Sequence, residues 1–143
     1  MTVVVGGDFI CALVRRGHAR HGDALALVET LDEDLVTSPL ALADIDRAVA
    51  DRVGADGQQA VWRDFERGAY AVRWWADALK ETLVIARRHP ETGLTRASLV
   101  ALAGRVNTRR IATFDEQFRT LTTPDGEAFV VLPADRSRKD HEL

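Results

Sequence analysis

The 143-residue chain is predicted to be an α/β protein, with a central mostly parallel sheet flanked on both sides by helices. Two observations lead to this prediction. Short runs rich in β-branched residues alternate along the chain with longer segments of helical periodicity. The first run, TVVV, is apolar at every position after the threonine, as expected for a parallel strand that is covered on both faces. A hydrophobic content of 46% is enough for one core.

The first half of the chain predicts two strands and four helices. The strands span residues 2–6 and 35–38, and the helices begin near residue 8 and span 20–31, 38–54 and 58–67. The third helix has the clearest ends, because Ser38 is a suitable N-cap, Pro39 fits the first turn and Gly54 fits the stop.

The second half predicts three strands and two helices. The strands span residues 69–75, 110–114 and 128–133, and the helices span 76–88 and 94–106. Strands separated by helices in this order favour a parallel sheet. With no repeat or linker in the sequence, we expect one domain over residues 1–134, followed by a polar C-terminal tail, 135–143, that frays.

Composition restricts the function. The net charge of −3 argues against a protein that grips nucleic acid by bulk charge, although a basic patch on one face stays open. The single cysteine, Cys11, lies in the apolar run FICALV, which excludes a disulfide framework and fits a cytoplasmic protein. The N-terminal apolar stretch is short and interrupted by Asp8, so we expect no signal peptide and no membrane span.

Ligands of open parallel sheets bind beyond the carboxyl ends of the strands. The segments expected there are 6–8, 38–46, the start of the helix at Leu94, and 113–117. Three of them carry carboxylates and the fourth carries a cation: Asp8, Asp44 with Asp46, Asp115, and Arg96.

The motifs SPLALADID (residues 38–46) and ASLVALAGRVNTRRIATFDEQF (residues 97–118) are the most specific in the chain. With their order and spacing, the sequence over residues 2–134 resembles the VapC branch of the PIN-domain endoribonucleases. The resemblance implies a three-layer α/β/α fold, a magnesium or manganese site of about four acidic residues, and hydrolytic cleavage of RNA. It also implies an antitoxin that wraps the toxin and can place a basic side chain in the acidic pocket.

The resemblance assigns the acidic positions one at a time. Gly6 stands where the family has its first aspartate, Asp44 replaces the usual glutamate, Arg96 stands at the third acid, and Asp115 fills the fourth. A further acid that is often present corresponds to Gln117. The chain therefore keeps two of four expected ligands, Asp44 and Asp115, for a magnesium or manganese ion.

A guanidinium in a metal site is costly. One unit charge acts on another with roughly 4 kcal/mol at ~4 Å and an effective dielectric constant near 20, and magnesium is divalent. Our hypothesis is that Arg96 acts as a built-in cation, forking onto Asp44 or Asp115 where the metal would lie. Simpler structural interpretations stay open: a solvated helix face for Asp44, a helix N-cap for Asp115, and a solvent-exposed Arg96.

Asp8 complicates this picture. It lies two residues after Gly6, where the family usually has a small hydroxyl residue facing the pocket, so it can restore part of the lost charge. An alternative register makes Asp8 the first family acid, but that places Phe9 and Ile10 where small polar residues belong.

We therefore expect a catalytically weak or inactive toxin homologue that binds RNA or an antitoxin-like partner. The alternative is an active magnesium-dependent endoribonuclease toxin of a type II toxin–antitoxin system. The resemblance also implies a homodimer, consistent with apolar positions expected to be exposed at Leu25, Leu27 and Leu42. Trp62 could stack on a base, but we expect it to pack against the sheet.

Overall fold

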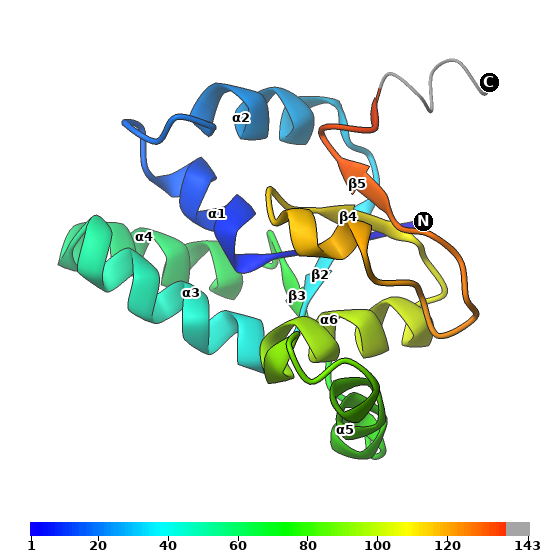
Figure 1. Cartoon of the computed structure of the whole chain (residues 1–143). Helices are drawn as coiled ribbons and strands as arrows, with labels where there is room; N and C mark the ends of the chain where they lie inside the picture. Colours follow the sequence, from blue (N-terminus) through cyan, green and yellow to red (C-terminus); the bar gives the residue numbers. More distant parts are fainter. Residues whose placement is uncertain (137–143) are drawn as a thin grey trace.

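The computed structural model describes residues 1–136, in which five strands and seven helical segments follow one another (Figure 1). The strands are β1 (Thr2–Val5), β2 (Asp34–Thr37), β3 (Ala71–Val72), β4 (Arg110–Ala112) and β5 (Val130–Leu132). The helices are α1 (Gly7–Val14), α2 (His21–Thr30), α3 (Pro39–Arg52), α4 (Ala55–Glu66), α5 (Ala78–Arg88), α6 (Gly93–Arg105) and the 3-10 helix η1 (Glu116–Arg119). Of the polar tail expected at 135–143, residues 137–143 lie outside the described residues.

The sheet has the strand order β3-β2-β1-β4-β5, and every pairing between these strands is parallel. β1 lies in the middle, with Val4 opposite Val36 of β2 on one side and opposite Ile111 of β4 on the other. The predicted parallel sheet is confirmed. Because the chain leaves β1 toward β2 and returns to its other side with β4, the strand order reverses at β1, which is where such sheets bind ligands.

Alternate residues of β1 enter two different cores. Val3 and Val5 pack with Phe9, Ile10 and other residues of α1, α2, α3 and α4. Val4 packs on the opposite face, among residues that α6 and η1 contribute. Two layers of helices therefore enclose the sheet, with α5 outside α6 (Figure 1), and the expected three-layer arrangement follows from the apolar run of β1.

Three expectations from the sequence are wrong. The strand expected over 69–75 is only the two-residue β3, whose residues are exposed at the sheet edge. Trp62 does not pack against the sheet: it is 48% exposed, and its indole N–H donates to Asp46 at 2.7 Å. Leu27, expected to be exposed, is 1% exposed in the core, whereas Leu25 beside it is 43% exposed.

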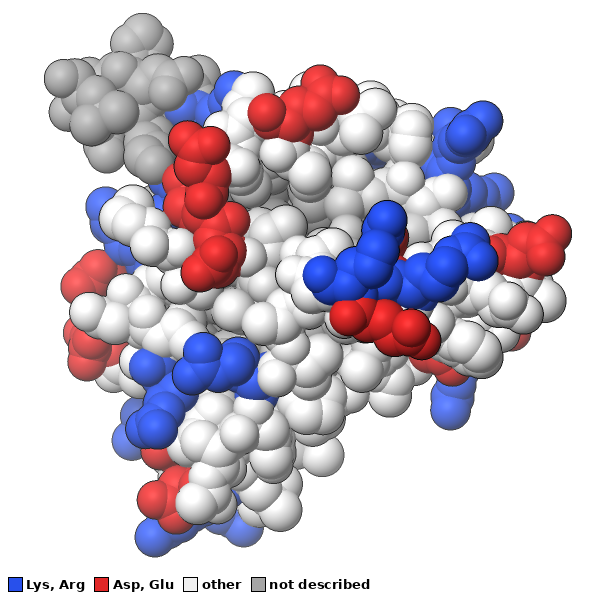
Figure 2. All heavy atoms as spheres, turned by 180° about the vertical axis from the view of Figure 1, so that it is seen from behind, with Lys and Arg blue, Asp and Glu red and all other residues white. Residues whose placement is uncertain are grey.

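The surface charge is dispersed on the face that Figure 2 shows. Lysine and arginine side chains lie there in small separate groups, next to acidic groups and divided by uncharged residues. This face offers no broad basic surface for a nucleic-acid backbone. Within residues 1–136, no helix has both the length and the apolar character that crossing a bilayer requires.

Candidate functional site

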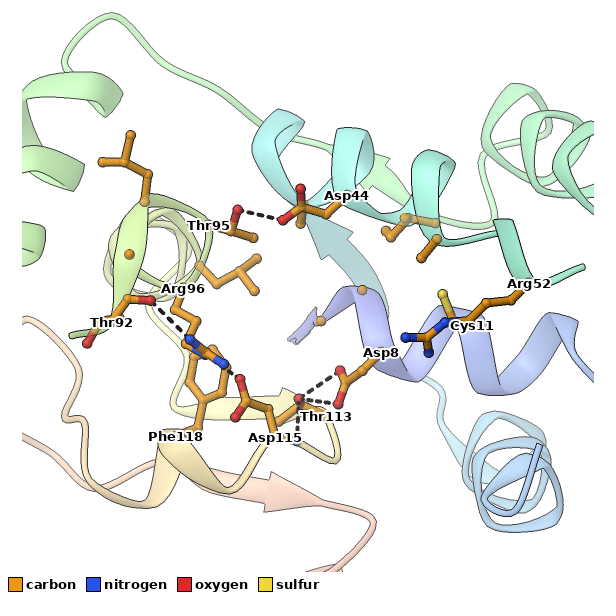
Figure 3. Close-up of a pocket in the computed structure, with 18 of the residues that line it drawn as sticks. Asp8, Cys11, Asp44, Arg52, Thr92, Thr95, Arg96, Thr113, Asp115 and Phe118 are labelled. Atoms are coloured by element: carbon orange, nitrogen blue, oxygen red, sulfur yellow. Dashed lines mark hydrogen bonds and ion pairs between the residues drawn. The ribbon is translucent and has the colours of Figure 1, made fainter. Parts of the chain in front are cut away.

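A cavity of about 560 Å³ opens beyond the carboxyl ends of β1 and β4, between α1, α3 and α6 (Figure 3). All four segments singled out in the sequence contribute to its wall. The charged and polar lining residues are Asp8, His18, Asp44, Arg52, Thr92, Thr95, Arg96, Thr113 and Asp115. The strand-end rule therefore located the cavity correctly from the sequence.

The Asp8 carboxylate is held on the β4 side of the cavity. Asp8 lies in the first turn of α1, and Thr113 follows β4, the strand paired with β1. The Thr113 hydroxyl lies 2.9 and 3.1 Å from the two Asp8 oxygens, and the backbone N–H of Phe114 donates to Oδ2 at 2.7 Å. The N–H of Phe9 donates to Oδ1 at 2.9 Å. These donors fix the carboxylate against the end of β4.

The surroundings of Asp8 raise its pKa above the ordinary value. Desolvation of the carboxylate is the largest cause, and the nearby charge of Asp115 acts in the same direction. The hydrogen bonds from Thr113, Phe114 and Phe9 oppose this shift without cancelling it. Asp8 therefore takes up a proton more readily than a carboxylate in water.

Asp44 faces the cavity from α3. This helix begins at Pro39 because the Ser38 hydroxyl caps it, accepting from the N–H of Ala41 at 3.1 Å. The same hydroxyl lies 2.7 Å from that of Ser98 and so ties the start of α3 to α6. Across this junction the Thr95 hydroxyl donates to Asp44 Oδ2 at 2.7 Å.

Arg96 points from the first turn of α6 to Asp115 rather than into solvent (Figure 3). Its Nε donates to Asp115 Oδ2 at 2.5 Å, and its Nη1 donates to the carbonyl of Thr92 at 3.1 Å. The other oxygen of Asp115 accepts from the N–H of Gln117 at 3.1 Å and caps η1. Asp115 is thus both a helix cap and the partner of Arg96.

Of the two partners predicted for Arg96, the guanidinium contacts Asp115, but the predicted fork on one carboxylate is wrong. One guanidinium nitrogen contacts Asp115 and another contacts the carbonyl of Thr92. Asp44 is bound to Thr95. Arg96 therefore neutralises the Asp115 side of the cavity and leaves the Asp44 carboxylate to a neutral hydroxyl.

The remaining sequence candidates have different positions. Gly6 lines the cavity at the end of β1. Gln117 is exposed and is not among the lining residues. Asp46 accepts hydrogen bonds from Gln58 and Trp62 of α4, which lower its pKa, so it joins two helices outside the cavity.

Four residues of the site were not among the individual candidates, although Thr95 and Thr113 lie in segments that the sequence singled out. Thr95 and Thr113 position the carboxylates Asp44 and Asp8, the Thr92 carbonyl positions Arg96, and the Arg52 guanidinium points into the cavity near Asp8 and Cys11 (Figure 3). Thr95 precedes Arg96 and Thr113 lies two residues before Asp115, so adjacency to the charged candidates was the available signal. No such signal was available for Arg52, because it lies at the C-terminal end of α3, away in the sequence from the charged candidates.

A sequence relative decides the family. The chain is 33% identical over 129 residues to ribonuclease VapC26 of Mycobacterium tuberculosis, and the alignment covers 85% of this chain and 96% of the relative. The chain belongs to the VapC family of PIN-domain proteins. A comparison with protein-family models gives no match.

Solved VapC structures share the fold. VapC20 of Mycobacterium tuberculosis, a toxin that cleaves the sarcin–ricin loop, superposes with a TM-score of 0.76 at 23% identity, over 82% of this chain and 93% of that one. VapBC2 of Rickettsia felis, solved bound to a DNA fragment from the VapBC2 promoter, superposes with a TM-score of 0.63 at 12% identity. The superposition covers 92% of this chain and 97% of that one. The resemblance seen in the sequence and its three-layer fold are confirmed.

The VapC family implies a divalent metal, which the side chains of this chain do not fit as they are arranged. Magnesium needs several oxygen ligands in near-octahedral geometry. Within residues 1–136, no group of three or more His, Cys, Asp or Glu side chains converges to hold an ion. The Asp8 carboxylate accepts a hydrogen bond from Thr113, and that of Asp44 accepts one from Thr95. The Asp115 carboxylate is paired with the Arg96 guanidinium.

Proposed function

We propose that this VapC-family protein keeps its pocket neutralised by Arg96 instead of a divalent ion, and that it cleaves RNA weakly or not at all. In this proposal it acts by binding RNA or an antitoxin-like partner. The observation that carries the proposal is the contact of Arg96 Nε with Asp115 Oδ2 on the wall of the cavity.

Charge supports this proposal. A guanidinium next to Asp115 repels a second cation, and at ~4 Å and an effective dielectric constant near 20 each unit charge contributes roughly 4 kcal/mol. Solvent reduces this figure, because the Arg96 side chain is 34% exposed and that of Asp115 is 22% exposed. A metal ion would have to displace Arg96 from Asp115 before it could bind there.

The second candidate is a magnesium- or manganese-dependent endoribonuclease. It is favoured by the presence of Asp8, Asp44 and Asp115 around one cavity and by the ribonuclease relative. In this alternative, Arg96 swings away and the three carboxylates supply the oxygen ligands that magnesium requires.

A charge-reversal assay separates the two candidates. Wild type, Arg96→Asp and Arg47→Asp are incubated with a mixture of tRNA and rRNA, with Mg²⁺, with Mn²⁺, or with EDTA. Arg47 is exposed on the same α3 that carries Asp44 but does not line the cavity, so its variant has the same change of net charge. We expect metal-dependent cleavage by Arg96→Asp alone.

Cleavage by the wild type with Mg²⁺ or Mn²⁺, abolished by Asp44→Ala, would instead establish the active enzyme. Cleavage by Arg47→Asp at the level of Arg96→Asp would show that net charge, and not the pocket, controls the activity.

We also propose that the protein pairs with an antitoxin and forms a homodimer. Leu25, 43% exposed on α2, is an apolar side chain that such an interface would cover. Light scattering coupled to size-exclusion chromatography tests the homodimer, and we expect a molar mass twice that of one chain. Leu25→Asp is expected to lower the measured mass toward that of the monomer.

A further inference from the structure

Gly6 is needed for space and not for backbone conformation. Its φ of −83° and ψ of 158° are extended values that any residue adopts. A Cβ at this position, however, would lie 2.9 Å from Asp8 Oδ1 and 3.1 Å from Thr113 Oγ1. Ordinary packing keeps such atoms well above 3 Å apart. A side chain at position 6 and the observed Asp8 carboxylate therefore exclude each other.

The Asp8 carboxylate cannot give way freely. It is bonded to the Thr113 hydroxyl and to the N–H groups of Phe114 and Phe9. Thr113 is 2% exposed and also accepts from the N–H of Asp115 at 3.0 Å, so its hydroxyl is fixed on both sides. Displacing Asp8 would leave these donors without their acceptor, which is unfavourable near a buried strand end.

We propose that Asp8 supplies, from the first turn of α1, the carboxylate that this pocket lacks at the end of β1. This acid comes two residues later in the chain, but its Oδ1 lies only 2.9 Å from the position of a Cβ at residue 6. The glycine at position 6 and the aspartate at position 8 are then linked: the absence of a side chain at position 6 makes room for the carboxylate of Asp8. Three carboxylates then line the cavity, and Arg96 neutralises one of them, Asp115, so that removing Arg96 would favour a hard divalent cation. Only this last consequence rests on the proposed function.

A comparison of melting temperatures tests whether a side chain at position 6 and the Asp8 carboxylate exclude each other. Gly6→Ala is expected to lower the melting temperature of the wild type, because the methyl group displaces the Asp8 carboxylate. In an Asp8→Ser background the same substitution is expected to lower the melting temperature much less, because only the approach to Thr113 remains and alanine suits this extended backbone. Gly22→Ala is the matched control, because no atom lies within 4 Å of the Cβ it would add. An equal loss from Gly6→Ala in both backgrounds would overturn the proposal.

A binding comparison tests the carboxylate itself, with Mn²⁺ followed by electron paramagnetic resonance. Three proteins are compared: Arg96→Ser, Arg96→Ser with Asp8→Ser, and Arg96→Ser with Asp8→Ser and Gly6→Asp. We expect the first and third to bind Mn²⁺ and the second to bind at least ~tenfold more weakly, since it lacks one oxygen ligand. The third variant returns the acid to position 6, so its recovery separates a ligand from a merely structural residue.

Equal affinity in the first and second proteins would overturn the role of Asp8. If Arg96→Ser binds no Mn²⁺ at all, the proposal that Arg96 keeps metal out is contradicted, and the melting-temperature comparison still decides whether a side chain at position 6 and the Asp8 carboxylate exclude each other.

Discussion

Two arginine–carboxylate pairs lie at opposite ends of the same sheet. At the amino ends of the strands, Arg110 of β4 donates from Nη2 to Glu33, just before β2, at 2.9 Å. At the carboxyl ends, Arg96 donates to Asp115 at 2.5 Å. The side chains of the first pair are 12% and 15% exposed, and those of the second are 34% and 22% exposed.

The difference in position gives the two pairs different roles. Arg110 and Glu33 join β4 to the start of β2 across the central β1, and two further nitrogens of Arg110 are buried without a hydrogen-bond partner within residues 1–136. Arg96 instead faces a cavity and has its second contact on a helix carbonyl. The first pair holds the sheet together, whereas the second sets the charge of the cavity.

The largest expected effect is at the amino ends of the strands. Glu33→Ala leaves Arg110 charged, unpaired and nearly buried, so we expect a loss of roughly 2–4 kcal/mol in the free energy of unfolding, near the lower end for broken buried pairs. Urea unfolding measures this, with Glu29→Ala on the exposed face of α2 as control. A loss no greater than that of the control would show that this pair contributes nothing to the sheet.

Arg96→Ala should have a smaller effect on the same measurement. Because its pair with Asp115 is partly solvated, we expect a loss of at most about 1 kcal/mol. The fold should therefore survive while the charge of the cavity changes. If Arg96→Ala destabilises the protein as much as Glu33→Ala does, both pairs stabilise the fold. The claim that the Arg96 pair mainly sets the charge of the cavity would then be contradicted.

The smallest expected effect is a pH dependence at Asp8. Desolvation raises its pKa in the folded state, so the folded state binds the proton more tightly than the unfolded one. The resulting stabilisation is fully present below the ordinary aspartate pKa of about 4 and is lost as pH rises through the folded value. As the pH is lowered from about 7 to about 4, the wild type should therefore become more stable relative to Asp8→Asn. Thermal unfolding of both proteins at several pH values measures this, and a relative loss over that range would contradict the assignment.

Four of the five strands, all except β3, and the site segments could be predicted from the sequence because each depends on local pattern. The apolar run of β1 indicates a strand covered on both faces, and the carboxyl-end rule then brings Asp8, Asp44, Arg96 and Asp115 to one edge of the sheet. The cap at Ser38 likewise needs only its own residue and the helix that follows.

What the sequence left undecided depends on contacts between distant segments. Arg96 could have paired with Asp44 or Asp115, and the choice follows from the position of η1, which Asp115 itself caps. The hydrogen bonds of Asp8 depend on the pairing of β1 with β4, which places Thr113 next to it. Trp62 is held at the surface by Asp46, which belongs to the neighbouring helix.

The most direct measurement of the central claim is anomalous scattering from wild-type crystals soaked in manganese. We expect no ordered peak between Asp44 and Asp115, with Arg96 Nε still in contact with Asp115. A strong, fully occupied peak there, with the Arg96 side chain turned out into solvent, would contradict the claim that a guanidinium holds the place of the metal.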